Sequence, residues 1–197
     1  GADIYLFSLY KVYGPHLGAL YIRSQLNADL PYQGHFFNAG SPGKRFTPAG
    51  PDHAQIATVN GVMDYMEALY SHHYDEPAAI QDQAEAVRNL FHGHEALVSQ
   101  PLLDYLDEHP AVRLIGKNRS AVRAPTVSFV VDGRSSLQLG EELAKKKLGV
   151  GVGNFYAYRL VEALGLDPDD GVVRASMVHY TSPDEVDRLI AALDQLI

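Results

Sequence analysis

One lysine near the start of the chain, Lys11, stands where an amine could carry out chemistry. It follows the apolar run 4–7 and Ser8, and the turn-forming pair Gly14-Pro15 comes shortly after it. Four consecutive apolar or aromatic residues predict a strand buried on both faces, and Gly-Pro predicts a tight connection. We therefore expect Lys11 in the loop at the carboxyl end of a buried strand, where open α/β sheets bind ligands.

A lysine in that place has two interpretations. It can be a surface residue whose stem covers apolar side chains while its ammonium group reaches water, since buried lysines are rare. It can also be a partly desolvated amine with a lowered pKa, which attacks an aldehyde. The position alone leaves both interpretations of Lys11 open.

The residues around Lys11 resemble the cofactor-lysine segment of the class V aminotransferases, a pyridoxal phosphate (PLP) family of fold type I that includes the cysteine desulfurases. The family pattern is Ser-x-His-Lys-x-x-Gly-Pro followed by Gly-x-Leu-Tyr, and this chain has Ser8, Lys11, Gly14 and residues 18–21 in those places. Tyr10 departs from the pattern, because the family usually has histidine there. The resemblance implies that Lys11 bonds to the PLP aldehyde and later acts as general base at the substrate Cα. It also implies that Ser8 and Tyr10 hydrogen-bond the cofactor phosphate.

A second segment, residues 45–52, resembles the family's loop Arg-Phe-Glu-x-Gly-Thr-Pro-Asn. In that loop the threonine reaches the cofactor phosphate of the partner subunit. The corresponding residue here is Gly50, whose backbone N–H could still donate although the hydroxyl is gone. Thr47 could substitute if the loop shifts.

A third segment, residues 173–180, resembles the family's Arg-x-Ser-x-x-x-Tyr-Asn strand, whose arginine binds the substrate α-carboxylate. Arg174 takes that place. A planar guanidinium makes two parallel hydrogen bonds to a carboxylate, which lysine cannot do. Without the resemblance, an edge-strand arginine paired with a surface acid is the plainer interpretation.

Residues 152–157 resemble the segment in which cysteine desulfurases carry their persulfide cysteine, and the matching residue is Tyr156. The chain contains no cysteine, so an enzyme-bound persulfide is unavailable to it, as are disulfides and thiolate metal sites. The run 149–153 lacks the spacing of a dinucleotide-binding loop and follows a helix. His92 and His94 lie two residues apart in a helical region and diverge, so no metal site is expected.

Composition narrows the function classes further. The 197 residues carry a net charge of −8, and lysine and arginine form no basic stripe, so no nucleic-acid partner is expected. No apolar run approaches the roughly 18 residues needed to span a bilayer, and no secretory signal is visible. With cysteine absent, these features lead us to expect a cytoplasmic protein with no membrane contact.

Apolar periodicity predicts the elements that position these residues. Helices are expected to begin at Asp52, near Ala78, after Ser135, at Tyr156 and after Ser182. The first is expected to continue to Tyr70, and Pro101 is expected to mark a break or a restart in the second. Strands are expected over residues 112–115, 126–131, 150–153 and 172–180.

We expect two parts: residues 1–85, the end of an α/β PLP-binding large domain, and residues 86–197, a small α+β C-terminal domain. One buried strand and a neighbour cannot complete a parallel sheet, since each edge needs a partner. Class V enzymes place most of the large domain ahead of the lysine, so we expect a missing N-terminal half. That half would hold the family's ring-stacking histidine and the aspartate that pairs with the pyridine nitrogen.

The resemblance implies a PLP-dependent transferase or lyase that acts on an amino acid as a homodimer, with sites at the subunit interface. The alternative is a catalytically silent domain that only dimerises or binds a partner. The departures at Tyr10 and Gly50, both at phosphate contacts, motivate this alternative.

Overall fold

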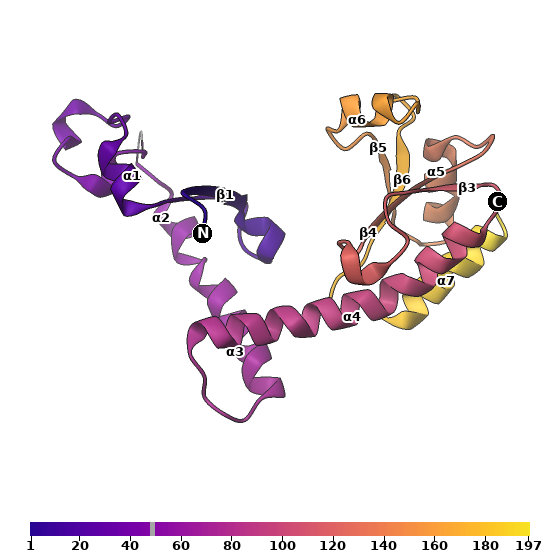
Figure 1. The fold of residues 1–197 in the computed structure, drawn as a ribbon, viewed down its shortest axis with the longest axis horizontal. Coiled ribbons are helices and arrows are strands. Elements are labelled where there is room, and N and C mark those ends of the chain that lie inside the picture. The colour runs from indigo at the N-terminus through magenta and orange to yellow at the C-terminus, as the bar shows by residue number, and fades with distance from the viewer. Residues whose placement is uncertain (48–49) are drawn as a thin grey trace. The chain divides into compact units, whose positions relative to one another are not determined.

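The computed structural model describes residues 1–47 and 50–197, and their contacts divide the chain into two compact units, Gly1–Val87 and Arg88–Ile197. Figure 1 labels most of the helices and strands along the chain.

The first unit begins with an antiparallel hairpin. Strand β1 (Ile4–Ser8) pairs with β2 (Gly18–Ile22), from Ile4 opposite Ile22 to Ser8 opposite Gly18. A 3₁₀ helix, η1 (Leu9–Val12), and a turn connect the strands. Leu9 is buried beneath the turn, and its N–H donates to the Leu17 carbonyl at 2.8 Å. The predicted strand and turn are present, but Lys11 lies in η1 rather than in an irregular loop.

The prediction that this strand is buried on both faces is wrong for the described chain. Ile4 is 45% exposed and Leu6 is 68% exposed, and β2 is likewise open on its surface. The physical reason is that β2 is the only described strand that pairs with β1. A two-stranded sheet cannot cover both of its own faces, so the apolar side chains of the hairpin remain accessible.

The rest of the first unit is helical. It contains α1 (Ser24–Asp29), the 3₁₀ helices η2 (Phe36–Asn38) and η3 (Pro42–Lys44), α2 (His53–Ala57) and α3 (Asn60–His73). The predicted cap is confirmed, since the Asp52 carboxylate accepts the Gln55 N–H at 3.1 Å. The predicted continuous helix is instead divided between α2 and α3. Thr58 Oγ1 donates to the Gln55 carbonyl at 2.7 Å, a side-chain bond that competes with helix continuation.

The long helix α4 (Ile80–Glu108) contains Pro101 in its interior, so the predicted break there is wrong. Proline costs about 3 kcal/mol in a helix interior. The next turn buries Leu102, Leu103 and Leu106 completely, and each buried leucine contributes about 1.5–3 kcal/mol. Packing therefore outweighs the lost backbone bond. Neither α4 nor any other described helix is apolar enough over sufficient length to cross a bilayer.

The second unit is built on a four-stranded antiparallel sheet. Its strands are β3 (Val112–Ile115), β4 (Thr126–Val131), β5 (Gly151–Gly153) and β6 (Val172–Ser176), in the spatial order β3-β4-β6-β5. The predicted strands are present, although the last is shorter than predicted. It ends at Ser176 because the chain turns back on itself, with the Thr181 N–H donating to the Val178 carbonyl at 2.9 Å.

One core lies on one face of this sheet. Helices α4, α5 (Ser136–Lys145) and α7 (Pro183–Asp194) contribute to it, while α6 (Tyr158–Ala163) follows β5 (Figure 1). Among the most deeply buried side chains are Leu102, Leu103, Leu106, Val127, Phe129, Leu139, Leu143, Val173 and Leu193. Because side chains alternate along a strand, Val173 and Ala175 point into this core and Arg174 points to the opposite face.

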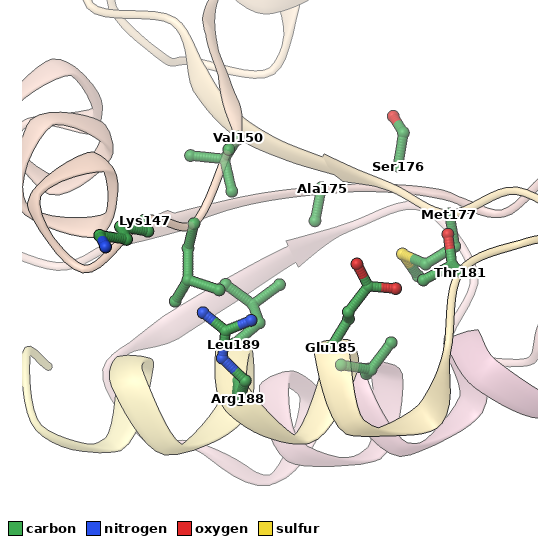
Figure 2. Close-up of a pocket in the computed structure, with 12 residues that line it drawn as sticks. Lys147, Val150, Ala175, Ser176, Met177, Thr181, Glu185, Arg188 and Leu189 are labelled. Carbon is green, nitrogen blue, oxygen red and sulfur yellow. The ribbon is translucent and has the colours of Figure 1, made fainter.

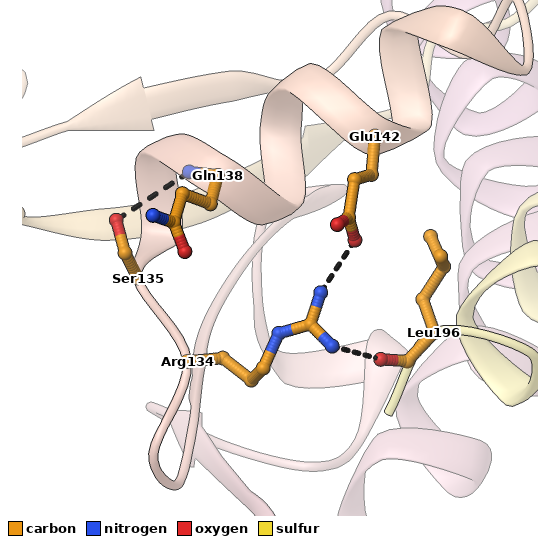
Figure 3. A network of polar contacts seen from close by, with 5 residues as sticks. All are labelled: Arg134, Ser135, Gln138, Glu142 and Leu196. Carbon is orange, nitrogen blue, oxygen red and sulfur yellow. Dashed lines mark hydrogen bonds and ion pairs between the residues drawn. The ribbon is translucent and has the colours of Figure 1, made fainter.

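Polar contacts fix the ends of these helices. Ser182 and Glu185 form the predicted capping box at the start of α7. Ser135 accepts the Gln138 N–H at the start of α5, and Arg134 joins Glu142 to the Leu196 carbonyl, the latter at 2.6 Å (Figure 3). The C-terminal residues are thereby tied to α5.

Candidate functional site

The end of β1 brings Ser8 and Lys11 into one open hollow over the hairpin. The same hollow is lined by residues 5–7 and 18–20. The Ser8 hydroxyl does not cap η1, and neither it nor the Lys11 ammonium group has a hydrogen-bond or ion-pair partner within residues 1–47 and 50–197. Both groups are therefore available to a ligand.

Lys11 is exposed. Within the first unit, its surroundings match those of a surface lysine. Desolvation of the Lys11 amine would need protein or ligand surface in addition to the described residues.

The turn that follows Lys11 is closely packed, which explains its glycine. A Cβ on Gly14 would lie 2.9 Å from Val62 Cγ2 and 3.0 Å from the Leu9 carbonyl oxygen. Tyr13 adopts the left-handed conformation (φ 67°), and its ring meets that of Tyr65 edge-on at 5.9 Å. Helix α3 therefore supports the segment that carries Lys11.

Tyr10 lies next to Lys11 in the chain but does not line the same hollow. Its ring stacks on that of His16, with centroids 4.9 Å apart and planes 9° apart. The structure therefore brings Ser8 and Lys11 together and leaves Tyr10 on a neighbouring surface.

Arg45 closes the loop that precedes the second predicted motif. Its Nη1 donates to the Leu30 carbonyl at 2.6 Å, and its own carbonyl accepts the Gln33 N–H at 3.0 Å. Thr47 Oγ1 donates to the Gly43 carbonyl at 3.5 Å. Gly50 is exposed and does not line the Lys11 hollow, and residues 48–49 of the motif lie outside the described residues.

Arg174 lies in the middle of β6, opposite Ser128 on one side and Gly151 on the other. Its guanidinium carbon lies 3.7 Å from the ring centroid of Phe155. Its Nε is buried and has no hydrogen-bond partner in the described part of the chain, and no described acid pairs with it. The plainer interpretation of Arg174, pairing with a surface acid, is therefore wrong for the residues that the structure describes. Phe155 was missed in the sequence because nothing local marks it as a neighbour of Arg174.

The bend after β6 is anchored to α4 by two histidines. His94 Nε2 lies 2.7 Å from the Thr181 carbonyl, and the His179 ring stacks on Phe91 with centroids 3.9 Å apart. Burial lowers the pKa of His179, and the nearby charge of His94 lowers it further. The described residues contain no group of three or more His, Cys, Asp or Glu side chains placed to hold a metal ion.

A separate cavity of about 200 Å³ lies between β6 and α7 (Figure 2). Ala175, Met177 and Leu189 line its apolar part, with Lys147 and Arg188 among its polar residues. Another lining residue, Glu185, already accepts the Ser182 N–H at 2.8 Å in the helix cap. Because Ala175 and Arg174 point to opposite faces of the sheet, this cavity is distinct from the surroundings of Arg174.

Comparison with known proteins gives matches along almost the whole chain. A family model described as "Aminotransferase class-V" matches residues 1–189. The aminotransferase-like protein FGM3 of Gibberella zeae is 37% identical, covering 100% of this chain and 46% of that protein. A probable cysteine desulfurase of Pseudomonas putida is 30% identical, covering 99% of this chain and 46% of that protein. The chain thus spans about half the length of these curated relatives.

Solved structures share the fold. A cysteine desulfurase from Thermococcus onnurineus matches with a TM-score of 0.76 and 23% identity, covering 100% of this chain and 47% of that chain. The desulfurase CsdA of Escherichia coli gives 0.73 and 22%, covering 98% and 45%. C-DES with glycine covalently linked to its PLP cofactor gives 0.61 and 20%, covering 97% and 45%.

Proposed function

Because the chain belongs to the class V aminotransferase family, we propose that it supplies the cofactor lysine and the carboxylate-binding arginine of a PLP-dependent enzyme that acts on an amino acid. The predicted fold class, a fragment of the fold type I PLP enzymes, is confirmed by the desulfurase structures that match 98–100% of the chain. The activity, the substrate and the partners of the whole protein belong to the proposal.

The observation that carries the proposal is the pair of unpartnered groups at the end of β1. Lys11 and Ser8 line one hollow and stand where the family motif has its cofactor lysine and a phosphate-binding serine. A lysine held only for structure would normally cover apolar surface or pair with an acid. An amine and a hydroxyl that have no partner among the described residues are suited to a ligand that carries an aldehyde and a phosphate.

The residues present therefore fit PLP. Lys11 would bind its aldehyde and move the Cα proton of the substrate. Ser8 would donate a hydrogen bond to the phosphate, Tyr10 would do so once its ring leaves that of His16, and the Gly50 N–H of a partner subunit would add another. When bound, the cofactor supplies a ring that accepts the charge developing at Cα.

Arg174 would hold the α-carboxylate of the amino acid. A buried donor without a partner costs about 1–3 kcal/mol, and the Arg174 Nε is such a donor in the described residues. A carboxylate would satisfy it while forming a paired hydrogen bond with the guanidinium. The ligand thus relieves a penalty that the free protein carries.

We further propose that the protein is a cytoplasmic homodimer and that its reaction is of the transferase or lyase type. Tyr156 stands at the position that resembles the persulfide cysteine of the desulfurases, so this chain would contribute no enzyme-bound persulfide. The competing candidate is a catalytically silent domain. It is favoured by Tyr10, whose ring is engaged by His16, and by the missing hydroxyl at Gly50.

The test is to add PLP to the full-length protein, follow its visible absorbance, reduce with borohydride and locate the labelled lysine by peptide mapping. The label is expected on Lys11. Lys11→Ala should abolish it, whereas Lys44→Ala, a matched change elsewhere in the first unit, should retain it. A protein that develops no chromophore supports the silent domain. Full amino-acid turnover by Lys11→Ala would refute the proposed role of Lys11.

A further inference from the structure

The loop between β5 and α6 places an aromatic ring against Arg174. The guanidinium carbon lies over the face of the Phe155 ring at 3.7 Å from its centroid. At this distance the ring covers one face of the cation and attracts it. The Nε–H of the same guanidinium is buried and has no hydrogen-bond partner among the residues that the structure describes.

The backbone of this loop is strained at the residue that carries the ring and at the residue after it. Phe155 and Tyr156 are consecutive and both left-handed, with φ of 51° and 63°. Bulky residues rarely adopt this conformation, because Cβ approaches the following carbonyl. Such strain persists only where the surroundings enforce it, and it gathers at ligand-binding sites.

Asn154 enforces the conformation. Its Oδ1 accepts the Tyr156 N–H at 3.1 Å, and its Nδ2 donates to the Pro168 carbonyl at 3.1 Å. Its backbone carbonyl accepts the Ala157 N–H at 2.8 Å. One side chain thus fixes the turn and ties it to the segment that leads into β6.

Glycines of the run 149–153 leave space for the Phe155 ring and for the neighbouring backbone. A Cβ on Gly151 would lie 2.9 Å from Phe155 Cε1 and Cζ, so a larger residue at position 151 would displace the ring from its present place against Arg174. Gly153 (φ 114°) forms a bridge with Gly171, where a Cβ would lie 2.1 Å from the Gly153 carbonyl carbon. The glycine run 149–153 lacks the spacing of a dinucleotide-binding loop, and its glycines instead allow close approach of the Phe155 ring and of the Gly171 backbone.

From these contacts we infer that Phe155 is a positioning residue for the amino-acid substrate. It holds the guanidinium of Arg174 so that its edge, with the free Nε–H, faces the α-carboxylate. Asn154 and Gly151 hold Phe155 in turn. This inference rests on the proposed function of Arg174.

The first measurement needs no cofactor. In protein with isotope-labelled arginine, the side-chain NMR signals of Arg174 should show the upfield shift of a group over an aromatic face. Phe155→Leu should remove this shift, and Phe155→Tyr should retain it. Absence of the shift in the unaltered protein would overturn the inference.

The second measurement uses the PLP-loaded, full-length protein. Cofactor absorbance is followed during titration with L-alanine and with ethylamine, which is alanine without its carboxylate. Phe155→Leu should weaken alanine affinity about two- to thirtyfold, the range for a cation–π contact, and leave ethylamine affinity unchanged. Phe155→Tyr should retain alanine affinity, and Tyr158→Leu, which removes an exposed ring three residues further along the chain, should have no effect.

The outcomes separate the two hypotheses. Equal alanine affinity in Phe155→Leu and in the unaltered protein would overturn the positioning role while leaving the proposed function intact. Equal weakening for alanine and ethylamine would also overturn it, because the effect would not involve the carboxylate. If the unaltered protein responds neither to L-alanine nor to any other amino acid in the same titration, the proposed function itself is refuted, and the positioning role with it.

Discussion

Replacing Arg174 with lysine should separate ligand affinity from protein stability. The substitution keeps the positive charge but removes the planar pair of donors and the Nε–H. A hydrogen bond to a charged group contributes about 1.5–3 kcal/mol, and lysine loses one of the two that a guanidinium can make. Amino-acid affinity should therefore fall about 10- to 150-fold.

The ligand-free protein should lose no more than about 1 kcal/mol of stability. Lysine at position 174 removes a buried, unpartnered donor, which relieves about 1–3 kcal/mol. It also weakens the contact with Phe155, which contributes about 0.5–2 kcal/mol. The two effects oppose each other, and their ranges place the free energy of unfolding between about 1 kcal/mol lower and about 2.5 kcal/mol higher than in the unaltered protein.

The assay is titration of the PLP-loaded protein with L-alanine, together with urea unfolding of the ligand-free protein. Arg113→Lys is the matched control, since Arg113 lies in the same sheet and its Nη2 donates to the Leu164 carbonyl at 2.9 Å. That control should lose some stability and keep alanine affinity. Unchanged affinity in Arg174→Lys, or a loss of stability large enough to explain the weaker binding, would refute the role assigned to Arg174.

Gly14→Ala should destabilise the first unit by about 1–3 kcal/mol, because the new Cβ meets Val62 at 2.9 Å; an unchanged melting temperature would contradict this packing. Ser182→Ala should cost about 1 kcal/mol by removing the cap of α7, measured by urea unfolding, whereas Thr181→Ser should not affect that cap. Burial raises the pKa of Asp170, but hydrogen bonds from Ser135 and the backbone of residues 136–137 outweigh it and hold the pKa below 3.8. Its stabilisation is present above that value and lost as the pH falls through the folded-state pKa, so Asp170→Asn should flatten the acid limb of stability. His179 has a lowered pKa, so the folded state resists its protonation and stability should fall as the pH drops below 6.5. His179→Phe should remove that part of the decline, and an unchanged profile between pH 8 and 5 would exclude His179 as its source.

Features set by neighbouring residues were predictable from the sequence. The caps at Asp52 and Ser182 follow from a polar side chain placed three residues before the backbone N–H that it binds. Strands β3 and β4 follow from short apolar runs between turns. The turn after Lys11 follows from Gly14, whose packing against Val62 supplies the physical reason.

Features set by distant residues were not predictable. The exposure of β1 depends on how many strands accompany it, which its own sequence cannot specify. Helix α4 continues through Pro101 because Leu102, Leu103 and Leu106 are buried in the core of the second unit. The break between α2 and α3 accompanies the hydrogen bond from the Thr58 hydroxyl to the Gln55 carbonyl, and the sequence alone does not specify that acceptor.

The candidate site also combines a feature set by neighbouring residues with a feature set by distant ones. Ser8 and Lys11 line one hollow because they are three residues apart in the connection that follows β1. The contact between Phe155 and Arg174 depends on a left-handed turn made by bulky residues, which no propensity suggests. The ligand-binding roles of Ser8, Tyr10, Lys11, Gly50 and Arg174 stay predictions, as does the domain boundary after residue 85.

The open hairpin of β1 and β2 makes protein concentration a variable in any measurement on this chain. No other described strand pairs with its outer edges, which lie next to apolar side chains such as Tyr5 and Leu6, and such edges recruit further strands. Self-association through the hairpin would raise the apparent melting temperature of the first unit as concentration increases. The second unit, which fills its own core, should melt at the same temperature in dilute and concentrated solution.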